Sequence, residues 1–150
     1  MPITDAMRAR HVVRQYLSTP LPNDVVAALR SRIEDNNRAH GTDIRLVTGD
    51  ARVFGPLWGT VRARSVRNCL VMSGPDAPDL DERLGYGGAD LMLAAQDLGL
   101  NTWWIGGTFS KRAAARVSGA TGRIVAVVAL GYGATRGSAH ASKRPEEVSS

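Results

Sequence analysis

The sequence has a single cysteine and few aromatic residues. Cys69 is the one cysteine among 150 residues, so no disulfide can form within the chain. Its place in the apolar run CLVM favours a buried, unreactive thiol over a nucleophile. Aromatic residues make up only 5% of the chain, so alanine, valine and leucine must fill most of the core. No stretch of about 18 apolar residues could span a bilayer, and no early apolar run resembles a signal peptide, so we expect a cytoplasmic protein.

Several motifs that mark common sites are also absent. The chain has no G-x-G-x-x-G or G-x-x-x-x-G-K-[ST] for phosphate binding and no G-x-S-x-G for a nucleophilic serine. GYGG at residues 85–88 matches neither glycine-rich spacing, and we expect it to open a helix after an acidic loop. His11, His40 and His140 stand too far apart for the spacing of metal ligands. The sequence therefore predicts no nucleotide loop, acyl-transfer serine or metal site.

Positive charge is plentiful and is mostly arginine. The net charge is +5, which could suit nucleic acid or an anionic small ligand, or could reflect composition alone. One cluster stands out in ARHVVRQY, residues 9–16, where Arg10, His11 and Arg14 lie close together. A solvated turn is one interpretation, because exposed charge is the norm. A phosphate site is the other, because the forked guanidinium donors of arginine match pairs of phosphate oxygens.

The order of apolar patterns predicts one α+β domain over residues 1–150. Apolar residues make up 43% of the chain and charged residues 22%, as in ordinary globular proteins. Helices and strands are interleaved without a regular βαβ repeat, so a mostly antiparallel sheet flanked by helices fits best. The patterns predict helices at 3–9, from Pro22 to Gly41, at 86–100 and after the N-cap Ser110; strands at 43–50, 68–74, 101–107 and 123–133; a turn or short helix at 54–64; an acidic loop at 75–83; and a polar tail from 134.

The predicted helix at 86–100 is apolar almost all round, and Gly99 suits a left-handed stop at its end. Apolar side chains occur on every side of it, at Leu91, Leu93, Ala94, Ala95 and Leu98. We expect a central, mostly buried helix. A chain of this size lacks the surface to cover such a helix by itself, which favours a dimer.

Two further stretches could contribute to a site. In NTWWIGG, Trp103 and Trp104 should point to opposite faces of a strand, while Gly106 and Gly107 leave backbone open to a flat ring. A buried tryptophan followed by a plain strand-to-helix turn explains the same residues. In SKRPEE near the C-terminus, the basic residues Lys143 and Arg144 could bind an anion or could belong to a disordered end.

Taken together, these pieces resemble the nitroreductase-like FMN flavoprotein family, and within it the compact branch called TM nitroreductases. RARHVVRQY followed by PLPNDVVAALRSRI is similar to that family's opening, in which R-x-S-x-R-x-[YF] precedes a helix that starts at proline. GGADLMLAAQDLGLNTWWIGGTF resembles its central helix and following strand, and this is the most specific match. VVALGYG and then KRPEE are similar to its last strand and basic C-terminal signature.

The resemblance implies an α+β homodimer that binds FMN at the subunit interface and passes electrons from NAD(P)H to an acceptor. Arg10, His11 and Arg14 would hold the FMN phosphate and ribityl chain, and Lys143 or Arg144 would close over the phosphate. A second set, Gly106 and Gly107, would bring backbone amides near the reactive edge of the isoalloxazine. No protein nucleophile is needed, since the cofactor supplies the hydride chemistry.

The chain also departs from the family pattern. Val12 stands where the family usually has a serine. EDNNRAHGTD replaces the family's S-x-x-N-x-Q-P-W segment, and only Asn36 and Asn37 are distantly similar to it. The missing segment normally lines the flavin and acceptor side. Two alternatives to the oxidoreductase therefore stay open: a flavin-binding or flavin-storing protein without turnover, and a basic nucleic-acid-binding module that uses Trp58 and one of Trp103 and Trp104 for stacking.

Overall fold

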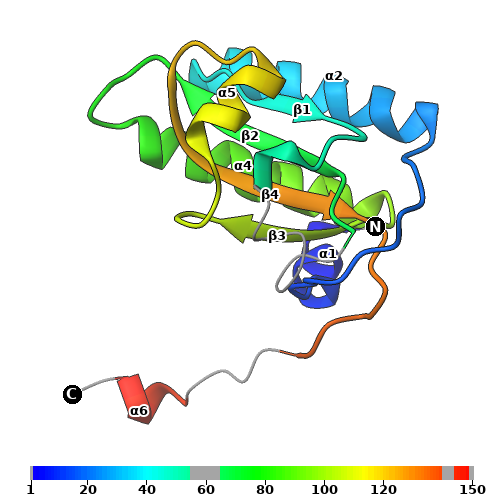
Figure 1. Cartoon of the computed structure of the whole chain (residues 1–150). Helices are drawn as coiled ribbons and strands as arrows, with labels where there is room; N and C mark the ends of the chain where they lie inside the picture. The colour runs from blue at the N-terminus through cyan, green and yellow to red at the C-terminus, as the bar shows by residue number, and fades with distance from the viewer. Residues whose placement is uncertain (1, 55–64, 140–143, 149–150) are drawn as a thin grey trace.

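The computed structural model describes residues 2–54, 65–139 and 144–148. Helices and strands alternate along the chain without a regular βαβ unit (Figure 1). In chain order the elements are α1 (Ile3–Ala9), α2 (Asn23–His40), β1 (Arg45–Val47), η1 (Arg52–Phe54), β2 (Asn68–Gly74), α4 (Leu80–Asp97), β3 (Asn101–Ile105), α5 (Lys111–Ser118), β4 (Arg123–Gly131) and α6 (Pro145–Val148).

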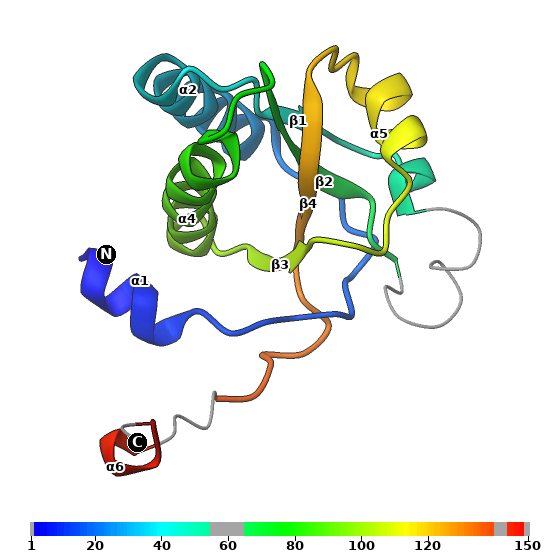
Figure 2. The same ribbon diagram turned by 90° about the vertical axis from the view of Figure 1, so that its left-hand side faces the viewer.

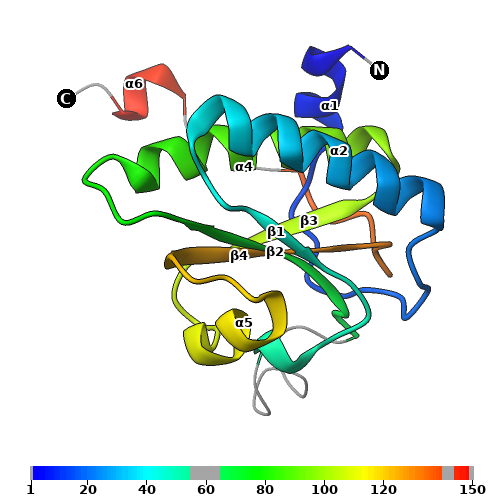
Figure 3. The ribbon, with the colours of Figure 1, turned by 90° about the horizontal axis from the view of Figure 1, so that it is seen from above.

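The four strands form one antiparallel sheet in the order β1-β2-β4-β3, so the predicted α+β class is confirmed. Figures 2 and 3 show α2 and α4 together on one face of this sheet and α5 on the other. Each face has its own apolar cluster. The central strand β2 is buried along its whole length, whereas β1 and β3 lie at the two edges.

Local sequence signals fix the ends of two helices as predicted. Pro22 precedes the first turn of α2, and Gly41 ends it in the left-handed conformation, with φ at 61°. The side chain of Ser110 accepts a hydrogen bond from the backbone N–H of Ala113, which caps α5. Gly99, with φ at 80°, follows the last turn of α4. These boundaries follow from side-chain chemistry within one turn of each helix.

The prediction for α4 was wrong at its start. The helix begins at Leu80, inside the expected acidic loop 75–83, because Asp81 and Glu82 favour a helix N-terminus. GYGG at 85–88 consequently lies within the helix and does not open it. A Cβ on Gly88 would lie 2.5 Å from Cζ3 of Trp104 and 3.0 Å from Cε of Met72. The glycine therefore permits a close approach between α4 and the sheet.

Other expected elements differ in length. The strand predicted at 43–50 is reduced to β1 of three residues, because Gly49 turns the chain with φ at 68°. The strand predicted at 123–133 ends at Gly131, and the tail contains the short helix α6. Of the turn or short helix expected at 54–64, residues 55–64 and with them Trp58 lie outside the described residues. Among the described helices, none is both long and apolar enough to cross a membrane.

Candidate functional site

The basic segment, residues 10–16, is fixed against the edge of the sheet. Val12 forms a parallel bridge with Thr102 of β3, and Tyr16 forms an antiparallel bridge with Gly133, just beyond β4. Backbone hydrogen bonds reinforce both ends, from the N–H of Ala134 to the carbonyl of Gln15 and from Leu17 to Tyr132, each 2.8 Å long. Figure 2 shows this stretch running beside β3 after α1. The segment is therefore an ordered part of the fold, and a freely solvated turn does not describe it.

Four cations lie along this edge. Arg10 and His11 are partly buried and Arg14 is exposed. The fourth is Arg136, which precedes Gly137; a Cβ on that glycine would lie 2.9 Å from Cβ of His11. Within the part of the chain that the structure describes, none of the four has a carboxylate partner. The edge is thus electropositive and uncompensated, as an anion site would be.

Sequence reasoning missed Arg136, because the residue belongs to no recognisable motif. The signal was only that glycine follows it directly at Gly137, whose φ is 72° and whose added Cβ would lie 2.7 Å from the carbonyl oxygen of Val12. That close backbone crossing brings the start of the C-terminal tail onto the basic segment.

Arg10 has a buried donor without an acceptor. Its Nη1 atom is inaccessible to solvent and makes no hydrogen bond within the described residues, although the side chain as a whole is only partly buried. A buried N–H of a guanidinium that lacks an acceptor is costly, and such a group calls for an explanation. A phosphate oxygen is the kind of acceptor that would satisfy it.

The two tryptophans point to opposite faces of β3, as predicted. Trp103 packs against the apolar cluster on the α5 face, and the guanidinium carbon of Arg14 lies 5.4 Å from the centroid of its ring, a cation–π contact. Trp104 contacts Gly88 of α4 on the other face and keeps 36% of its surface exposed. The Trp103 ring therefore ties Arg14 to the sheet edge.

Gly106 and Gly107 follow β3 and present open backbone. Both are exposed; a Cβ on Gly107 would meet no atom within 4 Å, and one on Gly106 would come only within 3.9 Å of Nε1 of Trp104. Since Val12 faces Thr102, Gly106 lies four residues, or about 13 Å, further along the strand. The glycine pair and the basic segment thus occupy the two ends of one strand, a spacing that only an elongated ligand could bridge.

Of the two C-terminal basic residues, the structure describes Arg144 alone. Arg144 is exposed and directly precedes α6, which Figure 1 shows apart from the sheet and its helices. Lys143 lies outside the described residues.

Cys69, Asn36 and Asn37 have structural roles. Burial raises the pKa of the Cys69 thiol to about 12, with a smaller contribution from the Asp50 charge, so the thiol stays protonated, as an unreactive core residue does. Buried Asn36 donates to Asp90, and Asn37 holds the loop between α2 and β1 through Thr42 and the backbone of Ile44.

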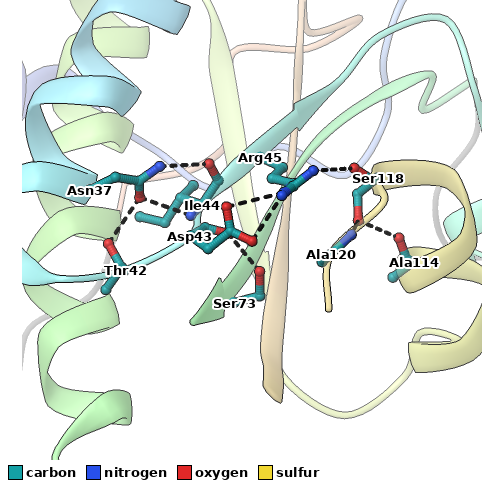
Figure 4. A network of polar contacts seen from close by, with 9 residues as sticks. All are labelled: Asn37, Thr42, Asp43, Ile44, Arg45, Ser73, Ala114, Ser118 and Ala120. Atoms are coloured by element: carbon teal, nitrogen blue, oxygen red, sulfur yellow. Dashed lines mark hydrogen bonds and ion pairs between the residues drawn. The ribbon is translucent and has the colours of Figure 1, made fainter. Parts of the chain in front are cut away.

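Figure 4 shows the Asn37 contacts continuing across the sheet edge at β1. The guanidinium of Arg45 bonds the carboxylate of Asp43 and the backbone carbonyl of Ser118, while the Ser73 hydroxyl donates to the carbonyl of Asp43. This network joins α2, β1, β2 and α5. It lies at the β1 edge, whereas the basic segment lies at the opposite, β3 edge.

Comparisons with known proteins agree with this fold. A profile of the family described as "Putative TM nitroreductase" matches residues 2–150. No curated protein matches the sequence.

Solved structures of similar fold come from several bacteria. A "putative nitroreductase in complex with FMN" from Desulfovibrio desulfuricans is 20% identical, with a TM-score of 0.71, over 97% of this chain and 92% of that chain. A nitroreductase-like family protein from Bacillus cereus is 20% identical, with a TM-score of 0.67, over 100% and 95%. A nitroreductase-like protein from Streptococcus mutans is 12% identical, with a TM-score of 0.72, over 98% and 96%. Since the family profile spans nearly the whole chain, the protein belongs to the family described as "Putative TM nitroreductase".

Proposed function

We propose that the protein is an FMN-dependent oxidoreductase of the nitroreductase type, which passes electrons from NAD(P)H to a small acceptor. The observation that carries the proposal is the set of cations on the basic segment that have no carboxylate partner among the described residues, together with the buried Nη1 of Arg10, which makes no hydrogen bond there. The family membership and the FMN complex of the Desulfovibrio desulfuricans relative support the same cofactor.

The residues fit the two ends of FMN. Arg10, His11 and Arg14 would hold the dianionic phosphate and the ribityl chain, and Arg136 adds a fourth cation beside them. At the other end of β3, the exposed backbone of Gly106 and Gly107 leaves room for a flat ring and offers amide donors. Lys143 or Arg144 would close over the phosphate from the C-terminal tail.

When bound, FMN supplies the hydride chemistry itself. The protein's part is then to bind and orient the cofactor and to place donors where negative charge develops on the reduced ring. The glycine pair can do this with backbone alone, because no side chain stands in the way. The buried, protonated Cys69 takes no part, since its thiol is inaccessible.

We further propose a homodimer, with the second copy covering a groove beside α4. The groove measures roughly 370 Å³ and lies between α1, α2 and α4; apolar side chains that line it include Ile3, Ala28, Leu93, Ala94 and Leu98. Ile3 and Met7 of α1 are 61% and 62% exposed. The groove is also lined by Arg32, Asp90 and Asp97. Exposed apolar side chains bordered by charged ones are typical of a face that another chain covers.

A flavin-binding protein without turnover is the second candidate. It is favoured by the structural hydrogen bonds of two side-chain amides: Asn36 bonds Asp90 between α2 and α4, and Asn37 bonds the backbone of Ile44 beside β1. Neither amide is left for an acceptor site. In that case the basic segment would still bind the FMN phosphate, but the protein would have no pocket for a second substrate.

Visible spectra of the purified protein with added FMN, followed by NADH or NADPH without oxygen, separate these functions. The oxidoreductase predicts bound flavin whose absorbance near its long-wavelength maximum is bleached by the nicotinamide donor. Flavin that stays bound and oxidised identifies the flavin binder. Salt-dependent retention on DNA without flavin uptake would identify a nucleic-acid-binding module and reject both.

A further inference from the structure

Tyr16 carries a buried hydroxyl that has no hydrogen-bond partner in the part of the chain that the structure describes. The residue is 4% exposed and belongs to the apolar cluster on the α5 face. Its backbone is bridged to Gly133, and its ring packs so closely on Gly131 that a Cβ there would lie 3.2 Å from Cδ1. The ring is therefore held in place, yet the hydroxyl is buried and makes no hydrogen bond within the described residues. A phenylalanine would fill the same space without burying an unpaired polar atom.

The charge of Arg10 acts on this hydroxyl. Burial raises the pKa of Tyr16 above its ordinary value, and the nearby Arg10 charge lowers it by a smaller amount. The hydroxyl thus stays neutral at physiological pH and can donate its proton. Nη1 of Arg10 is likewise buried and unbonded. Both buried donors belong to the basic segment, and neither has an acceptor within the described residues. An oxygen of a bound anion is the kind of acceptor that could satisfy them.

We propose that the Tyr16 hydroxyl and the Arg10 guanidinium form one subsite for an oxygen of a phosphate monoester, which makes Tyr16 a determinant of FMN over riboflavin. This inference rests on the proposed flavin function. Arg10 is the movable member of the pair, because its side chain is only partly buried and rotates about single bonds, whereas the Tyr16 ring is packed. In this proposal Arg10 adjusts to the bound phosphate while the Tyr16 ring stays in place.

The test compares Tyr16→Phe with the wild-type protein in equilibrium titrations with FMN and with riboflavin. Loss of one hydrogen bond to a charged group is expected to weaken FMN binding by about tenfold to a hundredfold and to leave riboflavin binding unchanged. Tyr86→Phe is the matched control, because Tyr86 is 69% exposed on α4 and loses the same oxygen atom away from the basic segment. Its two affinities should equal those of the wild type.

Thermal unfolding of the flavin-free proteins supplies a second readout with the opposite sign. Tyr16→Phe removes an unsatisfied buried hydroxyl, so its melting temperature should equal or exceed that of the wild type. A clearly lower value, with FMN and riboflavin weakened alike, would show that the hydroxyl only supports the fold and would overturn the proposal. Unchanged FMN affinity in Tyr16→Phe would overturn it while leaving the flavin function intact. A wild-type protein that takes up neither flavin would instead reject the flavin function, and this subsite with it.

Discussion

The contact between Arg14 and Trp103 joins the basic segment to a side chain with its own optical signal. The guanidinium carbon lies 5.4 Å from the ring centroid, and the ring rests on the core beneath. A cation at an exposed ring contributes about 0.5–1 kcal/mol, far less than a set of charge-assisted hydrogen bonds to phosphate. Arg14 should therefore matter more for an anionic ligand than for folding.

Replacing Arg14 by alanine tests whether the residue matters more for FMN binding than for stability. Arg14→Ala should weaken FMN binding at least tenfold, since each hydrogen bond between charged groups is worth about 1.5–3 kcal/mol, and should lower the free energy of unfolding by no more than about 1 kcal/mol. Tryptophan fluorescence in a titration measures the first, and denaturant unfolding the second. Arg30→Ala removes an equally exposed arginine from α2 as the control. Equal FMN affinity in the two variants would reject a phosphate role for Arg14.

At the scale of single elements, α4 packs on the sheet through glycine. Gly88 has Trp104 and Met72 against it, whereas a Cβ on Gly85, one turn earlier in the same helix, would meet no atom within 4 Å. The two positions share a helix and a residue type and differ in their surroundings alone. Substituting each glycine by alanine therefore distinguishes the effect of helix propensity from the effect of packing against the sheet.

Alanine at these two positions should act in opposite directions. Gly88→Ala is expected to destabilise the fold by about 1–3 kcal/mol, because its Cβ would overlap Trp104 and force the strand or the helix to shift. Gly85→Ala should stabilise it by about 0.5–1 kcal/mol, as alanine does in a helix. Denaturant unfolding of both variants measures these changes. A Gly88→Ala protein as stable as Gly85→Ala would show that the helix does not approach the sheet this closely.

Helices α2 and α4 are joined by a polar clasp at Asp90. The carboxylate accepts hydrogen bonds from Nε of Arg32 and from the Asn36 amide, both 2.7 Å long. The Arg32 hydrogen bond is the main reason that the pKa of Asp90 lies below its ordinary value, and the Asn36 amide adds to it. The clasp therefore makes the stability of the helix pair depend on pH.

The sign of that dependence follows from linkage. Because the pKa of Asp90 is lower in the folded chain than in the unfolded chain, its contribution is complete above the unfolded value, about 3.9, and is lost as the pH falls through the folded value. The free energy of unfolding of Asp90→Asn should accordingly fall less steeply than that of the wild type as the pH drops below about 5. Urea unfolding at several pH values measures both slopes. Parallel curves would mean that the carboxylate gains nothing from the clasp.

Most elements were predictable because their signals are local. Proline, serine and glycine at helix ends and the apolar run of β2 act within a few residues, and those boundaries are confirmed. The apolar run of β4 predicted the strand and its start, but the strand ends at Gly131 and not at residue 133. The start of α4 was not predicted, because the acidic composition of residues 75–83 is typical of a loop. Only the tertiary packing of Leu80 and Leu84, both fully buried, accounts for the extra turns of helix. Within the site, Arg136 and Tyr16 also escaped prediction, since both acquire their neighbours from a chain crossing that no local pattern encodes.

At the scale of the whole molecule, one groove stays open, and its lining combines apolar side chains with the charged residues Arg32, Asp90 and Asp97. The groove between α1, α2 and α4 is lined by side chains such as Leu93, Ala94 and Leu98, so the central helix is not covered on this side. The predicted burial of α4 holds for Leu91 and Ala95, which have no exposed surface. A second copy on this groove would complete the burial that the sequence pattern indicates.

A charge placed in the groove tests the dimer. Leu93→Glu should convert a dimer into a monomer, because a further carboxylate would be buried against the second copy beside the carboxylates of Asp90 and Asp97. Light scattering gives the mass of each protein. Ala39→Glu, an exposed position near the C-terminal end of α2, introduces the same charge outside the groove and should stay dimeric. A monomeric wild-type protein would contradict the dimer outright.

The central claim is that the basic segment holds the phosphate of FMN, and retention of flavin after desalting tests it most directly. Wild-type protein and an Arg10→Ala, Arg14→Ala double variant are incubated with excess FMN and passed through the same column. About one FMN per wild-type chain and a colourless double variant that remains folded are expected. Equal retention by both proteins, or a colourless wild type, would contradict it.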